Sequence, residues 1–250
     1  MIYLKTKKEI KIIAKAGEIA VASMEEVAKN IRPGVRSRDL DKIAEEKIRG
    51  LGAEPSFQKV PGYRHSICVT PNELVVHGIP GNRILAEGDI LGIDLGAYYR
   101  GFHADMAGTF PVGKISNENS QFLVVGKEAL KEAIREVKVG KRIGDISAAI
   151  QKVVEGAGYS VVRELVGHGI GRQLHEDPLV PGRGKAGSGE EIKEGMVLAI
   201  EVIYNMGKPA VRLLSDGWSI ATSDDSLSGL FESTVATTEK EPLVLTRLAS

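Results

Sequence analysis

The 250-residue sequence is short of several features, and each shortage excludes a class of protein. It has a single cysteine, Cys68, so no disulfide can form within the chain, and we expect a reducing compartment, the cytoplasm. Cys68 lies in ICVT, which is typical of a buried strand rather than of an activated thiolate. Lys plus Arg and Asp plus Glu number 33 each, so no overall charge would attract nucleic acid or an anionic membrane.

The sequence also lacks a long apolar run. Its first ten residues, MIYLKTKKEI, are interrupted by lysine and glutamate, which predicts neither a signal peptide nor a transmembrane helix. With 42% hydrophobic and 26% charged residues, the chain can bury a sizeable core. We therefore expect a globular protein with no nucleic-acid or membrane partner.

Two pairs of helices are predicted, one pair in each half of the chain. Helical spacing of apolar residues begins at Lys7, after a capping box of Thr6 and Glu9, and a second helix ends near Gly50. The phrase RPGVRSRDLDKIAEEKIRGLG returns 106 residues later as KVGKRIGDISAAIQKVVEGAG. We interpret this as a duplication within one domain, 1–250, with halves of roughly 1–115 and 116–250. Chance similarity between glycine-capped helices is the alternative.

Strands are predicted where β-branched and aromatic residues are bounded by Gly, Pro or Asp. The expected ranges are 66–70, 90–98, 102–110, 160–166, 196–204, 211–214, 218–222 and 227–237. Asp216-Gly217 predicts a two-residue hairpin turn between two of them. Together with the helices, these strands indicate an α+β fold.

Four carboxylates and one imidazole lie in or beside apolar or glycine-rich stretches: Asp94, Asp105, His168, Glu201 and Glu232. Acidic side chains are seldom buried unless they are paired or bind a metal, and no Lys or Arg is adjacent to the two glutamates. A shared cation site is the simplest explanation. Oxygen-rich ligands with one imidazole suit Mn²⁺, Fe²⁺ or Co²⁺ better than they suit a closed structural zinc site.

A tight hairpin would bring the two aspartates together. If Tyr98 faces Gly101, the antiparallel register places Asp94 directly opposite Asp105, with Cβ atoms about 4.5–5.5 Å apart. Carboxylates this close repel, and two divalent ions about 3.5–4 Å apart would convert the repulsion to attraction. Two exposed hairpin aspartates are the alternative.

Two more histidines are candidates for function. His168 and His175 lie in ELVGHGIGRQLHEDP, whose glycines let backbone and ligand approach closely, and His77 ends the apolar run LVVHGIP. A hydrogen-bonded structural role is the alternative for each.

The segments IDLGAYYRGFHADMAGTF, GHGIGRQLHEDP, AIEV and SLSGLFESTV closely resemble the type I methionine aminopeptidases, and the resemblance spans essentially the whole chain. It implies the pita-bread fold of creatinases and aminopeptidases, with two pseudo-symmetric halves and a curved antiparallel sheet backed by two helix pairs. It also implies a single catalytic domain. The implied activity is that of a metalloexopeptidase, which removes the initiator methionine from nascent chains whose second residue is small.

The resemblance further implies two divalent metal ions, whether Co, Mn, Fe(II) or Zn. Asp94 would bind one ion, Asp105 and Glu232 would bridge both, and His168 and Glu201 would hold the other. A metal-bridging hydroxide would be the nucleophile and Glu201 the proton shuttle, with no covalent intermediate.

The resemblance also assigns residues that contact the substrate. His77 and His175 would be catalytic, through hydrogen bonds to the peptide and to the developing tetrahedral species. Tyr63, Cys68 and Trp218 would line the methionine pocket. Further walls would come from Phe57 and Leu174, which depart from the residues common in bacterial relatives and leave the shape of the pocket open.

Two other functions stay open. Xaa-Pro dipeptidases and aminopeptidases share the fold and the ligand set, although they usually carry an additional N-terminal domain. A non-catalytic paralogue that acts as a binding module is the second, although such proteins tend to lose metal ligands. The expected partner is the N-terminus of a peptide or of a nascent chain at the ribosome, and the expected state is a monomer.

Overall fold

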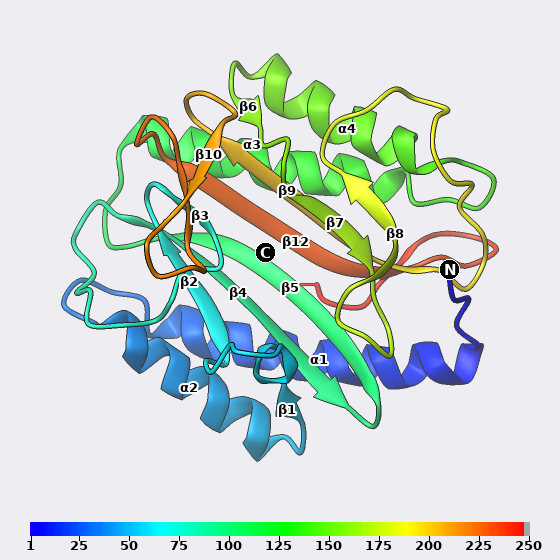
Figure 1. Ribbon diagram of the computed structural model, residues 1–250, viewed down its shortest axis with the longest axis horizontal. Helices are drawn as coiled ribbons and strands as arrows, with labels where there is room; N and C mark the ends of the chain where they lie inside the picture. Colours follow the sequence, from blue (N-terminus) through cyan, green and yellow to red (C-terminus); the bar gives the residue numbers. More distant parts are fainter. Residues whose placement is uncertain (248–250) are drawn as a thin grey trace.

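The computed structural model describes residues 1–247 and arranges four helices in two pairs around a large sheet (Figure 1). The pairs are α1 (Lys7–Lys29) with α2 (Ser37–Gly50), and α3 (Asn117–Arg135) with α4 (Ile143–Gly156). These helices confirm the predicted ones, and Thr6 and Glu9 form the predicted capping box. Within residues 1–247, no helix combines the length and the hydropathy that a membrane crossing requires.

A ten-stranded antiparallel sheet carries both helix pairs on one of its faces. Its main path is β1 (Glu54–Pro55), β4 (Ile90–Tyr99), β5 (Phe102–Pro111), β12 (Ser228–Ala236), β9 (Val197–Asn205), β7 (Val166–Gly169) and β8 (Glu176–Pro181). At its sides β2 (Ile67–Pro71), β6 (Ser160–Val161) and β13 (Leu243–Val244) pair with β4, β9 and β12. A smaller sheet joins β10 (Val211–Leu213), β11 (Ile220–Thr222) and β3 (Leu74–Val76). Figure 1 shows α1 and α2 below the central strands and α3 and α4 above them, so the predicted α+β architecture is confirmed.

Alternation along the strands decides which face of the sheet the helices cover. Ile93 and Leu95 of β4 belong to the apolar core formed with α1 and α2, and Leu198 of β9 belongs to the core formed with α3 and α4. Successive side chains of a strand point to opposite faces. Asp94 and Glu201 therefore point away from the helices, and the uncovered face carries the candidate site.

The predicted register of the β4–β5 hairpin is wrong. The turn is Arg100-Gly101, one residue later than expected, and Asp94 faces Ala107 rather than Asp105. Both turn residues have positive φ, 47° and 90°, which is the backbone that a mirror-image two-residue hairpin turn requires. Asp94 and Asp105 are consequently diagonal neighbours on one face of the sheet.

Two further predictions are wrong in detail. The range 160–166 holds β6 and only the start of β7, rather than one strand. Leu213 of β10 faces Ile220 of β11, so Asp216-Gly217 lies inside a longer loop and does not form a two-residue turn. The Asp216 carboxylate accepts hydrogen bonds from the Trp218 amide at 2.9 Å and from the next amide, which shapes this loop.

Within residues 1–247, four strands escaped prediction: β1, β3, β8 and β13. β1 and β13 span two residues each and β3 spans three, which leaves little room for a pattern to show. β8 contains Pro178 and Pro181, and proline counts against a strand in any prediction from propensity.

Candidate metal centre

Three of the predicted ligands lie on one line across the middle of the sheet. Asp94 of β4 faces Ala107 of β5, Ala107 faces Glu232 of β12, and Glu232 faces Glu201 of β9. Facing residues of a ladder project to the same side of the sheet. The side chain of Ala107 is a single methyl group, so the three carboxylates can converge above it.

Asp105 and His168 form the adjacent row on the same face. Asp105 lies two residues before the alanine of that line, and His168 faces Ala199, two residues before Glu201. Donor atoms of Asp105, His168 and Glu232 all lie within 4.8 Å of one another. The Nε2 atom of His168 is 3.5 Å from an oxygen of Glu201. The five predicted ligands therefore come from five strands and meet at one place.

The cluster is acidic and almost without positive charge. Burial raises the pKa of Asp105 to about 7, and burial together with the Asp105 charge raises the pKa of Glu201 to about 8. Burial and the neighbouring carboxylates raise the pKa of Asp94 and Glu232 well above their ordinary values. Within residues 1–247, His168 is the only ion-pair partner of these carboxylates. Four acids so placed are stable only with bound protons or a bound cation.

His168 is prepared to act as a ligand. Its Nδ1 atom lies 2.8 Å from the carbonyl oxygen of Gly169. Since a carbonyl oxygen only accepts, the ring proton is on Nδ1 and the lone pair is on Nε2, which faces the carboxylates. Burial lowers the pKa of His168 to about 4, so the ring is neutral at pH 7, the form that binds metals.

The carboxylate oxygens show directly that a partner is needed. Among the described residues, Oδ1 of Asp94 and Oε1 of Glu232 are buried and have no hydrogen-bond partner. A buried polar atom left unsatisfied costs about 1–3 kcal/mol, and more when it is charged. Carboxylates with one imidazole are ligands that divalent first-row metals accept. The residues present therefore fit a divalent metal centre.

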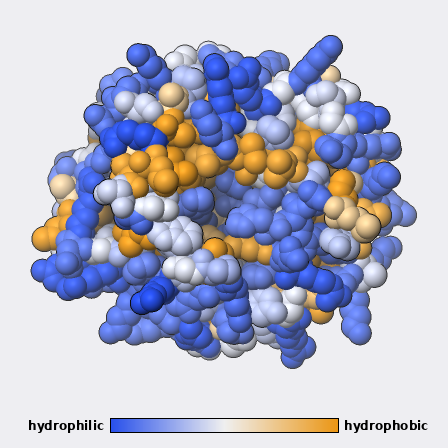
Figure 2. All heavy atoms as spheres, in the orientation of Figure 1, coloured by the Kyte–Doolittle hydropathy of each residue, from blue (hydrophilic) through white to orange (hydrophobic). Residues whose placement is uncertain are grey.

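The residues predicted for the methionine pocket lie together in one apolar cluster next to the acidic one. The Tyr63 ring packs edge-on against Phe57 and Trp218, with ring centroids 6.3 and 5.1 Å apart. Burial above all raises the pKa of Cys68, so its thiol is neutral and contributes apolar surface. Leu174 belongs to the same cluster. On the face that Figure 1 presents, Figure 2 shows apolar residues in a band around a hydrophilic centre.

His77 and His175 are exposed, unlike the cluster itself. The ring of His175 lies 4.4 Å, centroid to centroid, from that of His168, and both line a cleft of about 510 Å³. Neighbouring protein atoms shield the His77 ring from water and lower its pKa, and the nearby charge of His175 lowers it further. The backbone of His77 has a φ of 57°, which is uncommon for any residue other than glycine, and such residues cluster at functional sites.

Thr234 is a residue of this site that the sequence did not reveal. Its Oγ1 accepts a hydrogen bond from the Asp105 amide at 2.9 Å and donates one to the Asp105 carbonyl at 2.7 Å. The hydroxyl thereby fixes the backbone that carries one predicted ligand. The available signal was its position two residues after Glu232, on the same face of β12.

The chain is similar to known proteins over its whole length. The model of metallopeptidase family M24 matches residues 11–239. Methionine aminopeptidase 1 of Bacillus subtilis is 47% identical over 99% of this chain and 100% of its own length, and a Clostridium perfringens methionine aminopeptidase is 45% identical over 98% and 99%.

Solved structures agree with the sequence relatives. A Thermotoga maritima methionine aminopeptidase has a TM-score of 0.97 at 40% identity, covering 99% of this chain and 100% of its own. A Pyrococcus furiosus prolidase has a TM-score of 0.81 at 25% identity, covering 99% of this chain and 66% of its own. The predicted pita-bread fold and the predicted resemblance are confirmed. The chain belongs to metallopeptidase family M24, among its methionine aminopeptidases.

Proposed function

We propose that the chain removes the N-terminal methionine of peptides and proteins, with a divalent metal centre held by Asp94, Asp105, His168, Glu201 and Glu232. One observation carries the metal assignment: two carboxylate oxygens, on Asp94 and Glu232, are buried inside a cluster of four acids and have no hydrogen-bond partner within residues 1–247. Family membership supplies the reaction class, because this is a family of metallopeptidases.

Two ions, Co, Mn, Fe(II) or Zn, would share these ligands. Asp94, Asp105, His168, Glu201 and Glu232 would hold them, with Asp105 and Glu232 as the ligands common to both. When bound, the ions supply Lewis-acid polarisation of the scissile carbonyl and a water of lowered pKa. The number and the identity of the ions are part of the proposal, whereas use of a divalent metal follows from the family.

Three side chains of the protein handle protons and orientation. The Glu201 carboxylate can take up a proton on one oxygen during the reaction and release it to the leaving amine. His77 and His175, whose pKa values are lowered, are neutral imidazoles at pH 7 and would donate hydrogen bonds to the peptide and to the oxygen that gains charge.

The apolar cluster would select methionine. The unbranched thioether side chain of methionine would contact aromatic rings, a neutral thiol and an aliphatic chain. These belong to Tyr63, Trp218 and Phe57, to Cys68, and to Leu174. The Tyr63 hydroxyl donates to the carbonyl of residue 67 at 2.8 Å, so it is not free for a polar substrate. A charged side chain would lose its hydration there without a partner.

We also propose a single catalytic domain, 1–250, whose halves of roughly 1–115 and 116–250 arose by duplication. Each half supplies one helix pair, and the ligands are shared, with Asp94 and Asp105 from the first half and the other three from the second. Action as a cytoplasmic monomer, on chains at the ribosome, belongs to the same proposal.

A comparison of two peptides tests the proposed function. Metal-reconstituted protein should cleave Met-Gly-Met and leave Gly-Pro intact. Preference for Gly-Pro would instead favour a prolidase function. That alternative is tested because the fold also resembles that of a prolidase. Protein that binds no divalent ion after reconstitution would instead favour a binding module.

Glu201→Gln tests the proton assignment. Turnover should fall by about 10²–10⁴-fold, the usual contribution of general acid–base catalysis, while substrate binding weakens much less. Steady-state kinetics on Met-Gly-Met separate the two quantities, and near-normal turnover would end the assignment of Glu201 as proton shuttle.

A further inference from the structure

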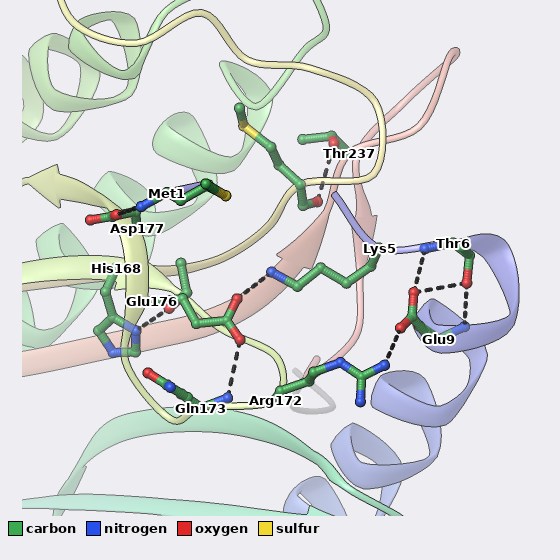
Figure 3. Close-up of polar contacts among 12 residues, drawn as sticks. Met1, Lys5, Thr6, Glu9, His168, Arg172, Gln173, Glu176, Asp177 and Thr237 are labelled. Carbon is green, nitrogen blue, oxygen red and sulfur yellow. Dashed lines mark hydrogen bonds and ion pairs between the residues drawn. The ribbon is translucent and has the colours of Figure 1, made fainter. Parts of the chain in front are cut away.

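The first nine residues are tied to the loop that carries His175. We name residues 1–9 the N-terminal arm and residues 172–177 the His175 loop. Three ion pairs join them, Met1 to Asp177 through the α-amino group, Lys5 to Glu176, and Glu9 to Arg172. Figure 3 shows the residues of the three pairs, with Asp177 and Glu176 next to His168 and the Arg172–Glu9 pair farther from it, by the start of α1.

Only the middle pair is buried. The side chains of Lys5 and Glu176 are each 5% exposed, with Nζ 2.6 Å from Oε2. The outer pairs reach solvent, since Met1 is 84% and Arg172 is 71% exposed. Exposed pairs contribute little to stability, whereas removal of one partner from a buried pair leaves an uncompensated charge. Of the three pairs, loss of Lys5–Glu176 should therefore disturb the His175 loop most.

Two glycines make room for Lys5. A Cβ atom on Gly171 would lie 2.5 Å from Cε of Lys5 and 2.9 Å from Oε1 of Glu176. Gly195 has φ of +86°, and its carbonyl accepts a hydrogen bond from the Lys5 amide at 2.7 Å. A Cβ atom there would lie 2.8 Å from the Lys5 carbonyl oxygen. Backbone and side chain of Lys5 are thus both enclosed in a fitted position.

The Glu176 carboxylate connects this position to His175. While Oε2 accepts from Lys5, Oε1 accepts from the Gln173 amide at 3.0 Å. The Glu176 side chain therefore reaches back over Leu174 and His175 to the backbone of Gln173, and closes the loop around His175. At the start of the loop, the Gly171 carbonyl accepts from the His103 amide at 2.7 Å, which fixes that end to β5.

The N-terminal arm also borders the cleft where a substrate would lie. Met1 and Tyr3 line the same cavity of about 510 Å³ as His168 and His175. The arm therefore lies beside His168 and His175, although it supplies none of the residues assigned to metal or methionine binding.

We propose that Lys5 is a positioning residue, which acts through Glu176 to hold the His175 ring toward the substrate. The inference rests on the proposed function, since it gives His175 a substrate to contact. A displacement of about 1 Å in a catalytic group can lower the rate by about a hundredfold, so a loose loop would show in turnover. A pair that serves stability alone would not act through His175.

Kinetics of four variants separate these cases: Lys5→Met, His175→Ala, their combination and Lys15→Met as control. Lys15 forms an exposed pair with Glu18 at 2.8 Å, far from the loop in the chain, so its loss should leave kcat unchanged. Lys5→Met should lower kcat between about tenfold and a hundredfold, with KM for Met-Gly-Met changed less than threefold. In the His175→Ala background the same substitution should lower kcat less than twofold further.

Two results would overturn the proposal. One is an unchanged kcat in Lys5→Met, and the other is an equal loss in the presence and absence of the His175 ring, because independent effects multiply. If Lys5→Met does not fold, Lys5→Met combined with Glu176→Gln replaces it, since no buried charge is then left alone and the Gln173 amide keeps an acceptor. The same two comparisons then decide.

Amide hydrogen exchange of metal-free protein gives a readout that needs no activity. Peptides covering residues 172–177 should exchange at least about tenfold faster in Lys5→Met than in the unmodified chain, and at the unmodified rate in Lys15→Met. Unchanged exchange in Lys5→Met would contradict the positioning role. Faster exchange in a protein that cleaves no methionine peptide would sink the proposed function while the role of Lys5 in holding the loop stands.

Discussion

Metal-free protein should lose stability as the pH rises from 6.5 to 8.5. The pKa of Glu201 is raised from 4.5 to about 8 in the folded state, and that of Asp105 from 3.8 to about 7. A group with a raised folded pKa stabilises the fold fully below its unfolded pKa and loses that contribution as the pH passes through the folded value. The unfolded chain has already released these protons at pH 6.5, so the loss falls in this interval.

The size of the effect follows from proton counting. Each pH unit over which the folded protein holds one proton more than the unfolded chain lowers the free energy of unfolding by about 1.36 kcal/mol. Between pH 6.5 and 8.5, Glu201 alone accounts for about 2 kcal/mol, which corresponds to a drop of about 4–8 °C in Tm for a chain of this size. Asp105 acts in the same direction. His168, with its folded pKa of about 4, is half protonated at pH 6.5 in the unfolded chain alone, so it opposes the drop by about 0.4 kcal/mol, well below the Glu201 effect.

Differential scanning calorimetry in a chelator at several pH values measures this drop. Saturating Mn²⁺ should remove it, because metal binding stabilises the deprotonated carboxylates and strengthens as the pH rises. Glu201→Gln should show a shallower pH dependence without metal, since it lacks the group that titrates. A Tm of the metal-free protein that stays constant or rises over this interval would refute the reasoning.

Two further outcomes are expected. Ile2 is a bulky second residue, so the protein should retain its own Met1, and an intact mass that lacks Met1 would contradict selectivity for small second residues. Gly126→Ala should destabilise the fold by about 1–3 kcal/mol, because the added methyl would lie 2.4 Å from a ring carbon of Phe231. Gly156→Ala should be nearly neutral, since its Cβ would meet nothing within 4 Å among residues 1–247. Equal Tm values for the two variants would contradict this packing argument.

The helices could be predicted because their signals are local. The capping box of Thr6 and Glu9 is set within four residues, and the apolar period repeats at every turn of the helix. The register of paired strands was predicted less accurately than the helices. Nothing in the sequence indicates that Arg100 adopts a positive φ, and a shift of the turn by one residue changed the partner of Asp94.

The candidate site was predictable as a set of residues but not as an arrangement. A carboxylate within an apolar strand has few physical explanations, so the four acids and His168 could be identified from sequence and then assigned by resemblance. The supporting contacts were hidden because they join distant segments. Thr234 lies 129 positions from Asp105, and Lys5 lies 171 positions from Glu176, so no local pattern relates them.

Anomalous X-ray diffraction from Mn²⁺-loaded crystals tests the central claim most directly. We expect two anomalous peaks enclosed by Asp94, Asp105, His168, Glu201 and Glu232, and loss of both when the crystals are soaked in chelator. Anomalous density held by other residues, or none among these five, would contradict the account.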